Sequence, residues 1–239
     1  MRVRVLLIIA VIVVVAGCQG GPSTSAESTT TTTTTTTKPP RTTTPPPRTT
    51  PKPDASTPHQ TVRFRLEIVD ANHDSMMIPA TSNPNPVHEP ATAARIRQDP
   101  ALATDKAVQQ RAAASLDCEH PDPLIGRDDP SLPLATCGPT EFTEFLGPAL
   151  LDGGMIAGAT YGPGGPVPGH WDVTVDLTPA GAKVLAGLAP KNVNVLLVLL
   201  FDGQVTGAAS VPEKPAGTLE ITYGSEDDAR QVAAVIDNR

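Results

Sequence analysis

The segment Val193–Phe201, VNVLLVLLF, is almost entirely apolar and decides the fold class. As a helix, nine residues at about 1.5 Å each would span roughly 14 Å, far less than the ~30 Å hydrocarbon core of a membrane. An apolar run of this length, rich in valine, is typical of a strand that is covered on both faces. We therefore predict that Val193–Phe201 is the central strand of a sheet.

Two segments on either side of this strand resemble each other. Asp152–Ala159, DGGMIAGA, is similar to Asp202–Ala208, DGQVTGA. Each segment is followed by an alternating strand and then by the start of a helix. After the first segment these are Trp171–Leu177 and Thr178-Pro179; after the second they are Leu219–Tyr223 and Ser225-Glu226. This pattern predicts an α+β, two-layer fold with a mixed or antiparallel sheet and helices on one face. Its head, at about 140–239, would be a duplicated β-β-α (ferredoxin-like) unit, joined to a small base region.

The first part of the domain is less regular. Thr61–Val69, TVRFRLEIV, alternates apolar and polar residues, which predicts a half-buried strand with Arg63, Arg65 and Glu67 on its polar side. Residues 70–98 are rich in proline and asparagine, so we expect a loop. Asp99-Pro100 then has the form of a helix N-cap followed by proline at the first helical position, and predicts a helix to about Ser115.

The front of the chain has the pattern of an export signal. A basic start, Met1–Arg4, precedes twelve apolar residues, Val5–Ala16, which fit the hydrophobic region of a signal peptide. Val15-Ala16-Gly17-Cys18 resembles a bacterial lipobox, so we predict a signal peptide at 1–17 and lipid attachment, with acyl chains such as palmitate, at Cys18. The alternative is an ordinary secretory signal with Cys18 near the cleavage site by chance.

Residues 18–60 are dominated by threonine and proline and contain no aromatic residue. Such a segment cannot bury enough apolar surface to offset the entropy of ordering it. We predict a lipid-anchored, disordered stalk that holds one folded domain, 61–239, away from the membrane.

The charge of this domain excludes one class of partner. Residues 61–239 contain 12 Lys+Arg and 23 Asp+Glu, a net charge of −11. A surface of this charge repels nucleic acid and anionic lipid headgroups, so we expect no nucleic-acid partner.

Two cysteines remain after Cys18. In an exported, oxidising context Cys118 and Cys137 most simply form a disulfide, closing a proline-rich loop. The alternative is a metal or nucleophile site with His120, although two thiolates and one histidine are too few for a closed zinc site.

Other motifs are weak. Asp70–Asp74 begins like a calcium loop but lacks the glycine and the glutamate that such a loop requires. The glycines between Gly162 and Gly169 suit a hairpin loop better than a phosphate-binding loop. Asp128 and Asp129 could pair as catalytic carboxylates, but the side chains of adjacent residues point apart. Trp171 is more simply a core residue than a ligand anchor. We therefore expect no enzyme activity, no metal and no cofactor.

The domain resembles the large extracytoplasmic domain of the SecD family. The segments that carry the resemblance, spread over 62–239, are FRLEIV (64–69), DPLIGRDDPSLPLATC (122–137), FLGPALLDGG (145–154), WDVTVDLTPAGAKVLAGL (171–188), DGQV (202–205) and LEITYGSEDDARQVA (219–233). The chain departs from the family in having no set of membrane helices, and in placing Gly207-Ala208-Ala209 where the family commonly has Ser-Ala-Pro.

The resemblance implies a lipid-anchored, non-catalytic binding module on the outer face of the cytoplasmic membrane. Its partners would be the membrane, through the anchor, and exported polypeptides or Sec translocase subunits. The alternative function is a small-ligand or lipid-binding cell-envelope lipoprotein that uses the crevice between base and head. A third hypothesis is a purely structural envelope protein.

Overall fold

The computed structural model describes residues 61–70, 78–79, 86–138, 142–165 and 168–238. The predicted signal peptide, Cys18 and the predicted stalk lie outside the described residues. The elements, in chain order, are β1 (Val62–Glu67), β2 (Ile78–Pro79), α1 (Pro90–Arg97), η1 (Pro100–Ala103), α2 (Lys106–Ala113), β3 (Leu134–Cys137), β4 (Phe142–Asp152), η2 (Gly153–Met155), β5 (Ile156–Pro163), β6 (Trp171–Leu177), α3 (Pro179–Asn192), β7 (Leu196–Phe201), β8 (Gln204–Ser210), β9 (Thr218–Tyr223) and α4 (Glu226–Asp237). In these ranges no helix has both the length and the hydrophobicity needed to cross a membrane.

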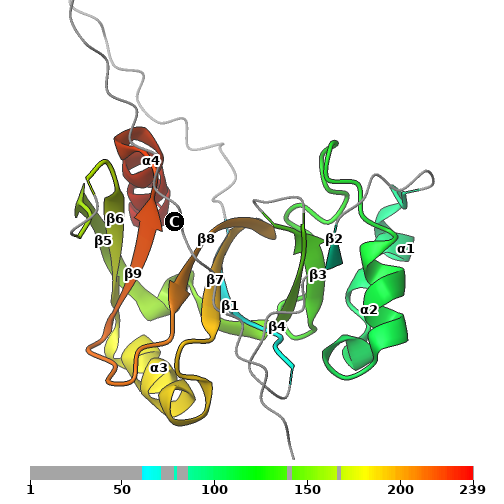
Figure 1. The fold of residues 1–239 in the computed structure, drawn as a ribbon, viewed down its shortest axis with the longest axis horizontal. Coiled ribbons are helices and arrows are strands. Elements are labelled where there is room, and N and C mark those ends of the chain that lie inside the picture. The colour runs from blue at the N-terminus through cyan, green and yellow to red at the C-terminus, as the bar shows by residue number, and fades with distance from the viewer. Residues whose placement is uncertain (1–60, 71–77, 80–85, 139–141, 166–167, 239) are drawn as a thin grey trace, which may run out of the picture. The chain divides into compact units, whose positions relative to one another are not determined.

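Six strands form the larger of two antiparallel sheets. Their order is β2-β4-β1-β7-β8, and β3 pairs with the other edge of β4. The sheet curls into a half-barrel, which Figure 1 shows nearly end-on. The predicted α+β class is therefore confirmed, and every strand pair described is antiparallel.

The apolar segment predicted as a central strand is β7, which lies between β1 and β8. Leu197 and Leu199 face the main core, while Val198 and Leu200 face the inside of the half-barrel. All four side chains are almost completely buried. Both faces of β7 are covered, as its sequence predicts, because core side chains lie against each side of the curled sheet.

The half-barrel is filled and flanked by the N-terminal helices. Ala93 of α1 and Leu124 join the residues inside the curl, with Leu134 and Leu146. Helix α2 and η1 cover the other side of β3 and β4 through a separate apolar cluster that includes Phe145.

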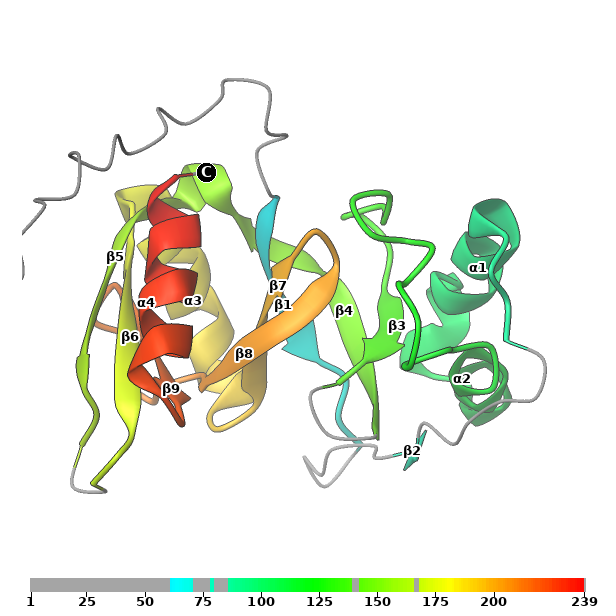
Figure 2. The same cartoon turned by 90° about the horizontal axis from the view of Figure 1, so that it is seen from above.

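Three strands form the small sheet, in the order β5-β6-β9. Val173 pairs with Ile221 and Val175 with Leu219, and all four side chains are buried in the main core. The intervening Glu220 is exposed, so the predicted alternation of these strands is confirmed. Helices α3 and α4 pack on the buried face only, between the small sheet and the half-barrel, as Figure 2 shows.

The predicted ferredoxin-like duplication is not shown. Strand β8, expected to pair with β9 in a second β-β-α unit, belongs to the larger sheet and pairs with β7. The two Asp-Gly segments also differ in structure. Asp202 and Gly203, with φ of 50° and 87°, form a two-residue hairpin turn between β7 and β8. Asp152 instead caps η2, which carries the chain from the larger sheet into the small one.

The predicted helix from Asp99 to Ser115 is divided in two. Asp99 caps only the short η1, and Asp105 then starts α2 by accepting hydrogen bonds from Ala107 N and Val108 N. Residues 70–98, expected to be a loop, contain α1. Glu89 caps this helix and Pro90 occupies its first turn, the same arrangement as Asp99-Pro100. The structure confirms the caps predicted for α3 and α4, Thr178 and Ser225.

Two carboxylates lie near each other at one end of the half-barrel. Glu67 of β1 is 8% exposed, and Glu144 lies on the neighbouring strand β4. Burial, and next the negative charge of Glu67, raise the pKa of Glu144. No lysine or arginine pairs with either carboxylate within the described residues.

Two glycines of α3 provide a test of the packing between α3 and η2. A Cβ on Gly181 would lie 2.3 Å from the backbone oxygen of Met155, whereas a Cβ on Gly187 would meet nothing within 4 Å. Gly181→Ala should therefore destabilise the domain by about 1–3 kcal/mol. Gly187→Ala should stabilise it by up to about 1 kcal/mol through helix propensity. Urea unfolding of both variants measures this, and a neutral Gly181→Ala would contradict the packing described.

A second prediction concerns pH. A raised pKa in the folded state means that Glu144 stabilises the fold when protonated and that this stability is lost as the pH rises through the folded pKa. Glu144→Gln should thus increase the free energy of unfolding more at pH 8 than at pH 5. Denaturant titrations at the two pH values test this. An effect of equal size at both would show that the Glu144 charge is not the cause.

Candidate binding groove

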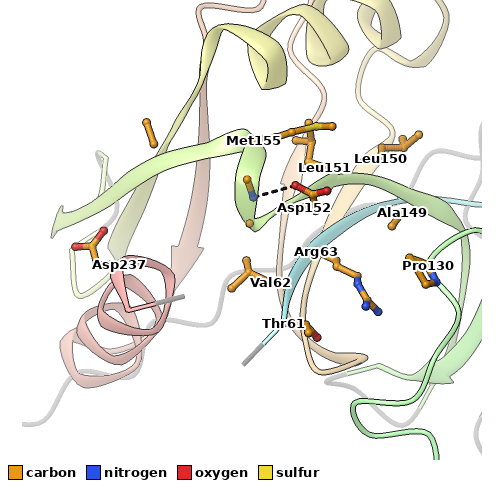
Figure 3. Close-up of a pocket in the computed structure, with 13 residues that line it drawn as sticks. Thr61, Val62, Arg63, Pro130, Ala149, Leu150, Leu151, Asp152, Met155 and Asp237 are labelled. Atoms are coloured by element: carbon orange, nitrogen blue, oxygen red, sulfur yellow. Dashed lines mark hydrogen bonds between the residues drawn. The ribbon is translucent and has the colours of Figure 1, made fainter. Parts of the chain in front are cut away.

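A groove of about 800 Å³ lies where the two sheets meet. Three segments that are distant in the sequence form it, as Figure 3 shows. They are the start of β1 (Thr61–Arg63), the end of β4 with η2 and the start of β5 (Ala149–Ala157), and the last residue of α4, Asp237; Pro130 adds a further wall.

The part of the groove formed by β1 and β4 is mainly apolar. Leu151 pairs with Phe64, one residue from Val62, and is almost completely buried. Leu150 and Met155 are partly buried and pack against the main core. Their exposed portions give the groove an apolar surface that can bury a side chain of a partner.

On one edge of β4, the loop 128–132 takes the place of a neighbouring strand beyond residue 146. Strand β3 pairs with β4 on this edge up to Leu146, and β1 and β2 pair with the opposite edge. Ala149 N donates to Pro130 O at 2.8 Å, and Gly147 O accepts a hydrogen bond from Arg65 at 2.9 Å. The backbone of β4 is therefore already paired at these two residues, and the loop forms a wall of the groove.

Two aspartates line the groove, Asp152 at the end of β4 and Asp237 at the end of α4. Asp152 Oδ1 accepts a hydrogen bond from Gly154 N, and Asp237 Oδ1 accepts one from Ala159 N, each at 2.9 Å. Both aspartates are exposed. These hydrogen bonds fix the position of each carboxylate and leave its second oxygen available.

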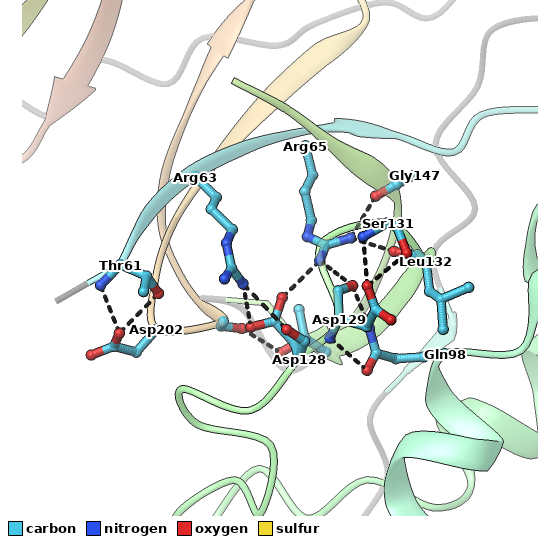
Figure 4. A network of polar contacts seen from close by, with 12 residues as sticks. Thr61, Arg63, Arg65, Gln98, Asp128, Asp129, Ser131, Leu132, Gly147 and Asp202 are labelled. Atoms are coloured by element: carbon cyan, nitrogen blue, oxygen red, sulfur yellow. Dashed lines mark hydrogen bonds and ion pairs between the residues drawn. The ribbon is translucent and has the colours of Figure 1, made fainter. Parts of the chain in front are cut away.

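A buried network positions the opposite wall of the groove. Arg65 is 0% exposed, although its alternating strand predicts a solvent-facing side chain, and this prediction is wrong because the sheet curls over it. The Arg65 guanidinium donates to four acceptors, Asp128 Oδ2 (2.7 Å), Leu132 O (2.6 Å), Gly147 O (2.9 Å) and Asp129 O (3.1 Å). Arg63 donates to Asp128 Oδ1 at 2.7 Å, so one carboxylate joins both arginines (Figure 4).

Charge and burial oppose each other in this network. Burial lowers the pKa of Arg65, while the hydrogen bond and charge of Asp128 act in the opposite direction. The side chain of Asp128 is 1% exposed. A charge buried to this degree requires its partner. The loop 128–132 is consequently held against β1, which places Pro130 beside the groove.

The predicted disulfide is confirmed. Cys118 and Cys137 are bonded, with their Cα atoms 5.7 Å apart. The thiols are therefore not a nucleophile or metal site, and His120 instead lies against Asp117, with Nδ1 2.8 Å from Oδ2. This hydrogen bond lowers the pKa of Asp117. In the part of the chain that the structure describes, no three histidine, cysteine or acidic side chains gather to hold a metal ion.

Sequence reasoning missed the residues that make the groove. No buried partner was predicted for Asp128, whose side chain pairs with Arg63 and Arg65. Asp152 and Asp237 were not singled out as site residues. The hairpin predicted around Gly162 is present between β5 and β6, and Trp171 packs half-buried on the main core, as the simpler hypothesis predicts.

Comparisons with known proteins found similarity to SecD and SecDF. No protein-family model matches the chain. Over 127 residues, half of its length, it is 33% identical to the protein translocase subunit SecD of two Mycobacterium tuberculosis strains. The chain is similar to SecD. The match covers 22% of the length of the SecD proteins, and half of this chain rather than the whole of 62–239.

Two solved SecDF structures overlap partly with the chain. SecDF is described there as a membrane component that enhances protein export, and the first structure has a TM-score of 0.40 at 20% identity, covering 75% of this chain and 63% of that one. The second, SecDF in a super-membrane-facing form, has a TM-score of 0.41 at 20% identity and covers 75% of this chain and 19% of that one.

The buried ion pair generates a prediction. Asp128→Asn removes the charge that Arg65 and Arg63 share and leaves Arg65 buried without a counter-ion. We expect a loss of about 3–5 kcal/mol in the free energy of unfolding. Asp129→Asn is the matched control, because the Asp129 side chain is exposed and Asn can still accept the hydrogen bonds from Ser131. Equal losses in the two variants, measured by denaturant titration, would refute the role given to Asp128.

Proposed function

We propose that this chain is a non-catalytic binding module that receives extended segments of exported polypeptides, or of translocase subunits, in the groove between its two sheets. Lipid on Cys18 would hold it at the outer face of the cytoplasmic membrane. The observation that carries the proposal is the 33% identity to SecD, a protein translocase subunit, over half of the chain.

The groove supports the same proposal. It offers apolar surface from Leu150 and Met155 beside two exposed aspartates, and both kinds of group can contact the side chains of a bound segment. A volume of about 800 Å³ is enough for several side chains. An extended chain is also the form in which a polypeptide emerges from a narrow channel, and its side chains can then enter a groove of this kind.

A second candidate function rests on the same volume. Small-ligand sites have volumes of about 300–1,000 Å³, and the groove falls in this range. A lipoprotein that binds a small molecule or a lipid here would release that ligand in native mass spectrometry of the purified chain. An extended peptide would not be expected to co-purify with fixed mass.

Site-specific photo-crosslinking in intact cells tests the proposed function. A benzoylphenylalanine at Ala157, which is exposed and lines the groove, should capture exported polypeptides or translocase subunits. The control position is Glu220, which is exposed on the outer face of the small sheet. Adducts from Ala157 alone support the proposal, and Cys18→Ser should reduce them by releasing the protein from the membrane. Identical adducts from both positions, or none, would contradict it.

A further inference from the structure

The charge of the groove is one-sided. Among the described residues that line it, Arg63 is the one cation, and its guanidinium is already paired with Asp128 at 2.7 Å. Asp152 and Asp237 are the two anions, and neither forms an ion pair with a described residue. The groove therefore combines an apolar surface with an unbalanced negative side.

The environment of Asp237 increases this negative potential. It is the last residue of α4, where the free backbone carbonyls carry partial negative charge, and α4 has no basic residue in its last turn. A carboxylate at a helix C-terminus is electrostatically unfavourable by itself. Its hydrogen bond from Ala159 N nevertheless fixes it beside the groove.

The second carboxylate is fixed in the same manner. Asp152 Oδ1 accepts a hydrogen bond from Gly154 N, at the turn where the chain leaves the larger sheet. In the described chain, Oδ2 of Asp152 and Oδ2 of Asp237 have no hydrogen-bond partner. Two oxygens remain free to accept hydrogen bonds from a cationic donor.

We infer that the groove selects polypeptide segments in which a lysine or arginine accompanies apolar residues. The apolar side chains would lie against Leu150 and Met155, and the cation would pair with Asp152 or Asp237. This inference rests on the proposed function, since it concerns the same groove. It adds a preference for positive charge, which apolar contact alone does not give.

Three peptides test the inference. They share one extended apolar sequence of ten residues and differ at a single position, which is arginine, glutamine or glutamate. Fluorescence anisotropy with the purified full chain should show the arginine peptide binding roughly 1.5- to fivefold more tightly than the glutamine peptide at low salt, because an exposed ion pair contributes this much. The glutamate peptide should bind most weakly, and 0.5 M salt should reduce the differences.

Two substitutions locate the effect. Asp152→Asn and Asp237→Asn remove the charges while an amide oxygen can still accept the hydrogen bonds of Gly154 N and Ala159 N, so the fold is retained. In the double variant the arginine and glutamine peptides should bind equally. Glu220→Gln, on the outer face of the small sheet, is the control and should keep the full preference for arginine.

The outcomes separate this inference from the proposed function. Tight binding of all three peptides with equal affinity would overturn the charge preference and leave peptide binding intact. A preference for arginine that survives in the double variant would also overturn it, by showing that other groups bind the cation. Failure of every peptide to bind would contradict the proposed function, and the inference with it.

Discussion

The Arg65 guanidinium lies inside the curled sheet without exposed surface, and most of the architecture around it follows from satisfying that charge. A buried cation is tolerated only with a paired anion and hydrogen-bond acceptors. Asp128 provides the anion, and the carbonyls of Leu132, Gly147 and Asp129 provide acceptors for the two terminal nitrogens, while Nε has no partner among the described residues. The loop that contains Asp128 is thereby drawn against β1 and β4. Its further attachments include the Cys118–Cys137 disulfide and the bidentate contact of Asp122 with Arg97 of α1.

The same interaction gives the groove its shape. Pro130 follows Asp128 and Asp129 directly, and its carbonyl accepts the hydrogen bond from Ala149 N on β4. A wall of the groove is thus fixed by a network whose centre is buried behind it. Asp152 at the end of β4 and Asp237 at the end of α4 are held in place by their hydrogen bonds from the backbone.

Local signals in the sequence predicted local structure well. The apolar run of β7, the alternation of β6 and β9, the caps Thr178 and Ser225 and the disulfide are all present. What the sequence did not reveal depends on how distant segments meet. Arg65 has the pattern of a surface residue, because nothing in FRLE shows that the sheet will curl over it. Strand β8 joins β7 rather than β9 because a tight turn at Asp202-Gly203 returns it to the larger sheet. The groove combines residues 61–63, 149–157 and 237, which no motif spacing can connect. Helix α1 is different: Glu89-Pro90 was a usable signal of its start.

Hydrogen–deuterium exchange of the full chain, with and without the arginine-bearing peptide, tests the central claim most directly. If an extended segment binds in the groove, amides in 149–157 and at the start of β1 should exchange more slowly in the complex. Exchange in residues 118–127 of the disulfide loop and in β9 should stay unchanged. Protection confined to 118–127 or to β9, with none in 149–157, would contradict the account.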